Sequence, residues 1–327
     1  MKKRNFLKEP LLWAFGLAPL CFLTFMCCGT YVIGLGDLLS PTPMQMAVIK
    51  LRAVRLLCGF VVGGSLAVAG AACQAALRNP LAEPYILGIS GGASFGAALA
   101  IITGLAAVSE VFIPGFSFIG ALAALTVVLG LSQFWTSDAS SSIALAGVVV
   151  GSIFSSMLMF LISISGSHEL NNVIWWMLGS LQPSGSFLLI VAIITLLAGV
   201  FILTAAGREV DAITFGEETA FSFGTDPRLL SYLLLGIAAL LAACSVAVAG
   251  IISFVGLIAP HMIRRLFGAG HRRLFPLCMV LGGIFLMGCD TFARCVWESR
   301  ELPVGVVTAL LGGPFFLWIL SRRRTWQ

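Results

Sequence analysis

The sequence predicts an all-α polytopic membrane protein, a bundle of about ten transmembrane helices in a single domain that covers residues 1–327. The chain is 59% hydrophobic and only 10% charged, whereas a soluble domain carries roughly 25% charged residues. Its apolar runs are about 20 residues long, the length that a helix needs to cross a bilayer. Membrane barrels instead show alternating segments of roughly 10 residues. These observations exclude a soluble enzyme and leave little chain for an extramembrane domain.

Apolar runs bounded by charged or Gly/Pro/Ser-rich stretches are the expected spans. They cover residues 11–33, 54–77, 85–103, 113–134, 142–165, 185–205, 230–249, 251–267, 276–297 and 303–321. The first run imitates a secretory signal, but it is too long and no A-x-A-like cleavage site follows it, so we expect a retained helix. Glycines four residues apart, such as Gly59 with Gly63 and Gly147 with Gly151, predict close helix packing within the subunit.

The distribution of basic residues predicts the orientation of the bundle. If the N-terminus is cytoplasmic, 14 of the 19 Lys and Arg residues fall on inner-facing segments. The positive-inside rule therefore favours both termini in the cytoplasm. The exceptions lie at or near the outer face and are Lys50, Arg52, Arg55, Arg294 and Arg300.

One internal repeat is visible in the sequence. Residues 65–70 read SLAVAG, and residues 245–250 read SVAVAG. The two copies fall in the second and seventh spans, which cross the membrane in opposite directions. This predicts an inverted repeat of spans 2–5 and 7–10, as many transporters have, although runs of Ala, Val and Gly also match by chance in such a composition.

The sequence shows no apparatus for catalysis or for metal binding. It contains no G-x-x-x-x-G-K-[ST], H-E-x-x-H or G-x-S-x-G motif, so phosphate cradling, zinc hydrolysis and serine hydrolysis by these devices are excluded. The cysteines lie inside apolar runs and are expected to act as small packing residues. The middles of the spans are nearly free of charge; Asp290 and Arg294, four residues apart in the ninth span, can neutralise one another.

The loop at residues 206–228 differs from the other inner connections. It mixes five carboxylates with Phe215, Phe221 and Phe223. Between Gly216 and Gly224 the spacing is helical, which predicts a short helix pair lying on the membrane. Its exposed aromatic side chains would fill a groove on a cytosolic protein.

Several separated motifs carry a resemblance to one known family. They are Leu51-Arg-x-x-Arg55; Arg78-Asn-Pro-Leu-Ala-Glu-Pro84 followed by Leu87-Gly-Ile-Ser-Gly91; Leu145-Ala-Gly147; Trp176-Met-Leu-Gly-Ser180; Gly216-Glu-Glu-x-Ala220 with Phe223-Gly224; Gly256-Leu-Ile-Ala-Pro-His261; and Glu301-Leu-Pro-Val-Gly-Val-Val-Thr-Ala309 with Gly313-Pro-Phe-Phe316. With these motifs in this order, the chain from Leu51 to Arg322 resembles the iron-chelate and cobalamin uptake permeases. These are the membrane subunits of type II ATP-binding-cassette importers.

The resemblance implies partners and a location. It implies a multi-pass permease of the bacterial inner membrane that pairs with a second permease subunit, a cytosolic ATPase dimer and a periplasmic substrate-binding protein. The second permease subunit is expected to be identical, with a diverged copy as the alternative. No cofactor is expected on this chain, because ATP and Mg belong to the ATPase, and no nucleic-acid partner is expected.

The resemblance also assigns a coupling segment, which sits in a groove of the ATPase and is pushed when the ATPase closes on ATP. The matching residues are Gly216, Glu217, Glu218, Ala220, Phe221 and Gly224.

Two further groups of residues receive roles by resemblance. Arg52, Arg55 and Arg294 match arginines that pair with carboxylates of the binding protein; contact with lipid headgroups is the alternative. The turn from Asn79 to Leu81, with Ser140 and Ser141, corresponds to the cytoplasmic constriction, and Ser167 lies at the outer end of span 5. Spans 5 and 10 are expected to line the pathway at the dimer axis.

The sequence therefore predicts a permease subunit that imports a metal chelate, most plainly a ferric siderophore, by alternating access. Cobalamin and haem remain open as substrates, and molybdate is a minor option. An ion-coupled secondary transporter is the alternative from another class, but it needs titratable residues inside the spans, and these are scarce here. An intramembrane enzyme would need a nucleophile and a base on facing helices, and no such pair is evident.

Overall fold

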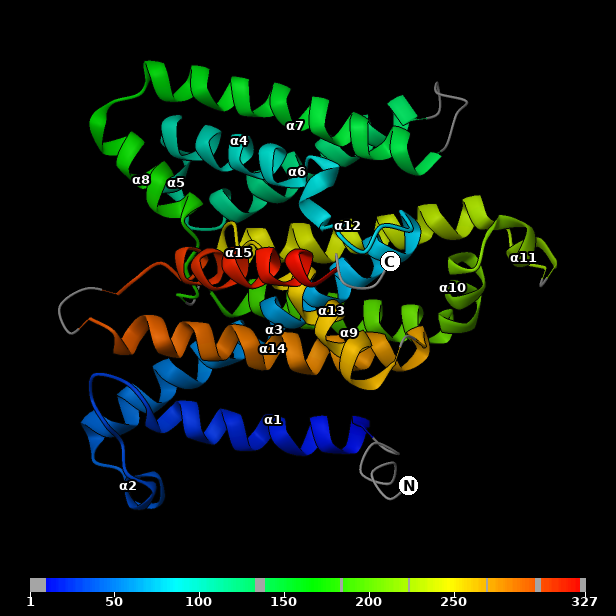
Figure 1. Cartoon of the computed structure of the whole chain (residues 1–327). Helices are drawn as coiled ribbons and strands as arrows, with labels where there is room; N and C mark the ends of the chain where they lie inside the picture. The colour runs from blue at the N-terminus through cyan, green and yellow to red at the C-terminus, as the bar shows by residue number, and fades with distance from the viewer. Residues whose placement is uncertain are drawn as a thin grey trace, which may run out of the picture.

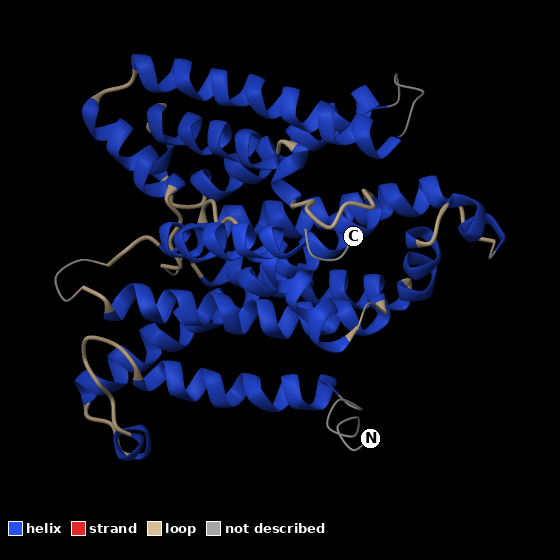
Figure 2. Cartoon of the chain, viewed as in Figure 1, coloured by secondary structure: helices blue, strands red, loops and turns tan. Residues whose placement is uncertain are grey.

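The computed structural model describes residues 10–132, 139–182, 185–222, 224–268, 270–297 and 301–323, and this part of the chain is helical without strands (Figure 2). The elements in chain order are α1 (Pro10–Cys27), α2 (Leu35–Leu39), α3 (Pro43–Ala76), η1 (Pro84–Leu87), α4 (Ile89–Ile102), α5 (Leu105–Val108), α6 (Phe112–Ser132), α7 (Ala139–Ile164), α8 (Ser167–Met177), α9 (Ser186–Ala205), α10 (Gly207–Thr214), α11 (Glu217–Ser222), α12 (Pro227–Ala249), α13 (Val255–Phe267), α14 (His271–Cys295) and α15 (Val304–Arg323). The predicted all-α fold is confirmed.

Each predicted span overlaps one of the long or apolar helices, α1, α3, α4, α6, α7, α9, α12, α13, α14 or α15. Seven of the described helices are long and apolar enough to cross a membrane, namely α1, α3, α6, α7, α9, α12 and α14. The helices α4 and α15 are apolar over shorter described stretches, and α13 has 13 residues. The total of ten spans therefore stays a prediction.

The long helices lie side by side in one bundle (Figure 1). The helices α10 and α11 lie at one end, which we call the inner end because the positive-inside rule assigns it to the cytoplasm. The helices α2 and α8 lie at the opposite, outer end (Figure 1). Helix α1 begins towards the inner end (Figure 1), and the cytoplasmic location of both termini stays a prediction.

Two helix ends show the largest differences from the expected spans. Helix α1 ends at Cys27, although its apolar run extends to residue 33, because the chain turns over the side chain of Arg52: a Cβ at Gly29 would overlap this guanidinium. Helix α3 begins at Pro43 rather than at residue 54, because Thr42 and Gln45 form a capping box there and capping, not hydropathy, fixes a helix start. At about 1.5 Å per residue, its 34 residues exceed a bilayer core of about 30 Å.

Two spans are interrupted rather than continuous. The expected third and eighth spans start at residues 85 and 251, but their α-helices begin four residues later, after Gly88 and Phe254, which both have left-handed backbone (φ +75° and +71°). The Tyr85 hydroxyl donates to the Ile252 carbonyl oxygen at 3.2 Å. The Phe254 N–H donates to Glu83 at 3.2 Å. Irregular backbone survives inside an apolar bundle only where such groups satisfy it.

Close backbone contact holds the centre of the bundle together. Helix α3 packs against α14, α12 and α13, and from Gly59 onward nearly all of it is buried. A Cβ at Gly63 would overlap the carbonyl oxygen of Gly282 in α14, and one at Gly70 would overlap the backbone of Gly256 in α13. Without a hydrophobic drive between helices in lipid, such small-residue contacts supply the packing energy.

The glycine spacing and the repeat both find a place in this packing. Gly147 in α7 lies against the Ile86 carbonyl, and a Cβ built at Gly151 would be 3.5 Å from Gly88, so these glycines pack within the subunit, as predicted. The two repeat copies lie in α3 and at the end of α12, which run in opposite directions (Figure 1). An inverted repeat requires this orientation.

Gly70→Ala is expected to destabilise the bundle, because the added methyl group overlaps the Gly256 backbone. Overpacking of this kind usually costs about 1–3 kcal/mol. Gly236→Ala in α12 is the matched control, because its new methyl group meets no atom within 4 Å and Ala is favoured over Gly in a helix by roughly 0.5–1 kcal/mol. Thermal unfolding in detergent measures both; equal melting temperatures for the two variants would contradict the close-contact account.

Candidate functional site

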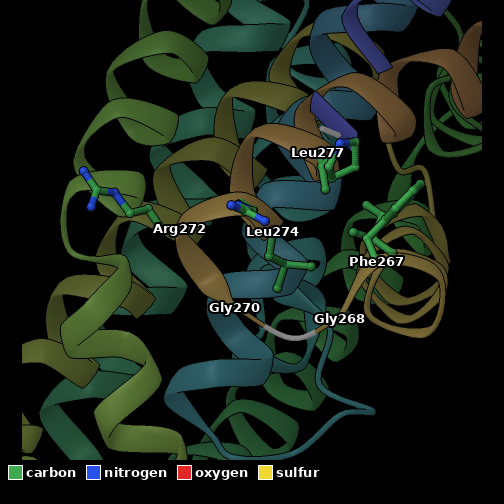
Figure 3. A pocket seen from close by; sticks show the side chains of 9 residues that line it. Phe267, Gly268, Gly270, Arg272, Leu274 and Leu277 are labelled. Carbon is green, nitrogen blue, oxygen red and sulfur yellow. The ribbon is translucent and has the colours of Figure 1, made fainter. Parts of the chain in front are cut away.

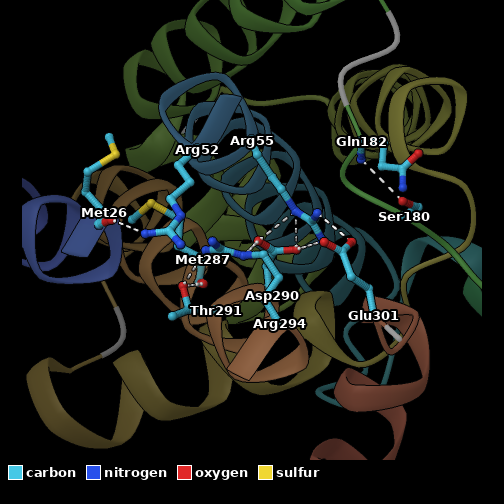
Figure 4. Close-up of polar contacts among 10 residues, drawn as sticks. All are labelled: Met26, Arg52, Arg55, Ser180, Gln182, Met287, Asp290, Thr291, Arg294 and Glu301. Carbon is cyan, nitrogen blue, oxygen red and sulfur yellow. Dashed lines mark hydrogen bonds and ion pairs between the residues drawn. The ribbon is translucent and has the colours of Figure 1, made fainter. Parts of the chain in front are cut away.

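Charged side chains from distant parts of the chain meet at the outer end of α3 and α14 (Figure 4). We call this group the outer charge cluster. It consists of Arg52, Arg55, Asp290, Arg294 and Glu301. Helix α3 supplies two of the arginines, α14 supplies the ion pair that its i,i+4 spacing predicts, and Glu301 precedes α15.

Asp290 is the centre of this cluster. It is fully buried (0% exposed) and accepts from Arg55 Nε at 2.9 and 3.1 Å on its two oxygens. Arg294 Nε also donates to it, at 3.1 Å. A buried carboxylate is tolerated only when it is paired and hydrogen-bonded, and here two guanidinium groups pair with it.

Arg55 and Arg294 each have a further partner. Arg55 Nη1 lies 2.7 Å from Glu301, whose side chain is 52% exposed. Arg294 Nη2 donates to the Thr291 hydroxyl at 3.1 Å. Three arginines thus face two carboxylates, which leaves the cluster with an excess positive charge, and Glu301 is its solvent-exposed carboxylate.

Arg52 has a different environment from the other two arginines. It is buried (8% exposed), and its guanidinium donates to the carbonyl oxygens of Met26 at 3.0 Å and Tyr31 at 2.7 Å. A cation at the C-terminal end of α1 satisfies carbonyl groups that the helix itself leaves without donors. Arg52 therefore fixes the turn that follows α1.

The inner end carries a helix pair, α10 and α11, and the predicted coupling segment, from Gly216 to Gly224, contains α11 alone. Left-handed glycines bound α11, with φ +125° at Gly216 and +74° at Gly224. Phe215 and Phe221 are 80% and 62% exposed, as predicted, whereas Ala220 is buried. Glu217 and Glu218 lie in α11, but their side chains, like all of Phe223, lie outside the described residues.

A close contact joins α10 to the first turn of α14. Asp211 Oδ1 accepts from the His271 backbone N–H at 3.0 Å and lies 2.6 Å from His271 Nδ1. We call this pair the inner clamp. A Cβ added at Gly207 would lie 2.7 Å from backbone atoms of Arg272, so the start of α10 lies directly on α14.

Helix α14 thus links the two polar sites. Its 25 residues span about 37 Å, with the inner clamp at its first residue and the outer charge cluster near its end. Between these ends it is largely buried against α1, α3, α9 and α13.

The predicted gate residues occupy both ends of the bundle. Asn79 is exposed in the turn after α3, where its side chain accepts from the Leu81 N–H at 2.9 Å. Ser140 and Ser141 begin α7; Ser141 is exposed, and the Ser140 side chain lies outside the described residues. Ser167 is exposed at the start of α8, at the outer end. The structure brings none of these five residues into the outer charge cluster.

Metal binding has no visible site in the described part of the chain. No three His, Cys, Asp or Glu side chains gather there closely enough to hold an ion. Five of the cysteines, Cys58, Cys73, Cys244, Cys278 and Cys289, are buried free thiols, which pack as small hydrophobic groups.

Comparison with known proteins gives a family match. The model of the FecCD transport family matches residues 17–322. The chain is 37% identical to the cobalamin import system permease of Halobacterium salinarum, over 86% of this chain and 75% of the relative. It is 35% identical to the hemin transport system permease of Yersinia pestis, over 84% of this chain and 83% of the relative.

A solved structure shares the fold. It is described as an inward-facing conformation of a transporter assigned to the metal-chelate ATP-binding-cassette type. The TM-score is 0.87 at 28% sequence identity, and the match covers 96% of this chain and 99% of the other.

Asp290→Asn is expected to destabilise the protein by about 3–5 kcal/mol, because it leaves two guanidinium groups without a buried countercharge. Glu301→Gln removes the exposed carboxylate of the same cluster and should cost under about 1 kcal/mol. Denaturant unfolding in detergent compares the two variants. Equal losses of stability would contradict the central position of Asp290.

Proposed function

This chain belongs to the FecCD transport family, and from that premise we propose that it is a homodimeric permease subunit that imports a metal chelate through the bacterial inner membrane. The family consists of multi-pass transport permeases, and hydrolysis of ATP with Mg is proposed for a separate cytosolic ATPase dimer. The observation that carries the proposal is the position of the polar groups along α14. The inner clamp lies at one end and the outer charge cluster at the other, and the stretch between them is apolar and tightly packed.

The helix expected to line the pathway supports a chelate rather than a bare ion as substrate. Helix α7 contains no Asp, Glu, Lys or Arg, and its exposed surface mixes apolar side chains with Ser152 and Ser156. A hollow of about 400 Å³ beside it is lined largely by glycine and serine, among them Gly88, Ser90 and Ser155. Bare divalent cations need oxygen or nitrogen ligands with matched charge, whereas a chelate brings its own ligands.

A ferric siderophore is the proposed cargo. Two other metal chelates remain alternative substrates, because one relative is named as a cobalamin importer and another as a hemin transporter. A weakly polar pathway suits all of these, so selection among them is proposed to belong to the periplasmic binding protein.

The inner end provides a route for force from the ATPase. The exposed Phe215 and Phe221 are proposed to enter an apolar groove on that subunit. Because α10 is joined to α14 through Asp211 and His271, a push on the coupling segment would move α14 as a rigid rod. The movement would reach the outer charge cluster at its far end.

The outer charge cluster is proposed as the docking point for the binding protein. Asp290 is buried beneath the arginines, whereas Glu301 is exposed on Arg55. A carboxylate of the incoming protein can replace Glu301 without disturbing Asp290. Charges of this kind mainly set the register and the rate of encounter. Docking through Arg55 thus needs no rearrangement of the buried core.

Uptake into proteoliposomes tests the function. Vesicles that contain the permease, the ATPase and the binding protein are expected to accumulate a ferric siderophore only with ATP and Mg. Phe221→Asp should abolish uptake and co-purification of the ATPase, because it places a charge in an apolar contact. Glu209→Lys, an exposed charge reversal in α10, is the control that should retain both. Uptake driven by an ion gradient without ATP would contradict the proposal.

A further inference from the structure

A groove at the inner end of the bundle lies between α9 and α14. It has a volume of about 430 Å³ and is lined by Leu197, Val200, Phe201, Thr204, Arg272 and Pro276, among others. Phe201 is 75% exposed and Leu197 56%, so the wall of the groove is apolar and open to the surroundings. Arg272 stands at the end of the groove where α14 begins. We call this feature the α9–α14 groove.

Arg272 brings a charge to this apolar surface. Its side chain is exposed, and no described carboxylate forms an ion pair with it. In Figure 3 it extends away from Phe267 and Leu277, which line a second hollow, of about 270 Å³, under the connection between α13 and α14. Arg272 and the next residue, Arg273, both line that second hollow. Two adjacent guanidinium groups therefore stand at the inner ends of neighbouring apolar hollows.

Thr204 adds an unsatisfied hydrogen-bonding group. Its buried Oγ1, on the wall of the groove, has no hydrogen-bond partner among the described residues. Buried hydroxyl groups normally have a partner. This hydroxyl oxygen is itself buried, so the groove offers a ligand an apolar surface and a cation.

We infer that the α9–α14 groove binds an anionic phospholipid of the cytoplasmic leaflet. An acyl chain fits the surface of Leu197, Val200 and Phe201 at the depth where these residues meet the hydrocarbon. The lipid phosphate can accept paired hydrogen bonds from the planar guanidinium of Arg272. Basic pockets between helices on the cytoplasmic side are the expected sites for acidic headgroups.

Because of the position of the groove, a bound lipid would affect the contact between α10 and α14. Arg272 lies next to His271 of the inner clamp, and Gly207 of α10 packs on the Arg272 backbone. A lipid bound at Arg272 thus stabilises the first turn of α14 where α10 meets it. This consequence rests on the proposed function, whereas the binding itself does not.

Lipid-dependent stabilisation tests the site without transport. The purified full-length permease in detergent is titrated with dioctanoyl phosphatidylglycerol or with phosphatidylcholine of the same chains, and the melting temperature is followed. We expect the half-saturating concentration to be lower for phosphatidylglycerol by about fivefold, the preference that one basic residue near an acidic headgroup provides. Arg272→Gln should remove this preference. Arg228→Gln, an exposed arginine in the first turn of α12, is the matched control and should keep it.

A second variant and a competitor complete the test. Phe201→Ala should weaken binding of both lipids equally, because it shortens the apolar wall and leaves the charge in place. The inference is overturned if Arg272→Gln keeps the preference, if Arg228→Gln loses it as well, or if inorganic phosphate alone reproduces the stabilisation. The last result would show an anion site without a lipid.

Discussion

The free-energy cost of an unpaired charge in an apolar environment determines where the charged residues of this protein lie. An ionised side chain buried without a partner is unfavourable by several kcal/mol, so the buried charges described above have either an opposite charge or, like Arg52, backbone carbonyl groups as partners. Asp290 is buried beneath two arginines at the outer end, and Asp211 contacts His271 at the inner end. The centre is left to glycine and other small residues, where α3 approaches α14 and α13 backbone to backbone.

This division suits the proposed role of the chain as a conduit between an ATPase and a binding protein. The exposed polar and aromatic side chains that could recognise other proteins lie at the two ends of the bundle. Helix α14 connects the outer charge cluster at one end with the inner clamp at the other. Helix α14 is held along its length by α3, α1 and α9, so its two ends cannot move independently. The irregular segments at residues 83–88 and 250–254 are stabilised by Glu83 and Tyr85.

The sequence predicted much of this arrangement, and the parts that it missed share one cause. Apolar run length and basic-residue bias placed the helices and the end that each site residue occupies. The amphipathic loop predicted the exposed Phe221. The bond between Arg55 and Asp290 joins residues 235 positions apart, and no spacing rule reaches that far; the same holds for Asp211 with His271. Helix ends were misplaced at Cys27 and Pro43, because hydropathy reports lipid contact, whereas Arg52 and Thr42 terminate the helices.

In the proposed mechanism, the inner and outer sites communicate through α14. The most direct measurement is the affinity of the binding protein for the assembled transporter, with and without ATP on the ATPase. Coupled sites change affinity by roughly 5–150-fold, and we expect the ratio of the affinities with and without ATP to lie in this range for the natural sequence. Asp211→Ala should bring the ratio close to one while the ATPase stays bound, and Glu209→Ala should leave it unchanged. An unchanged ratio in Asp211→Ala would contradict the claim.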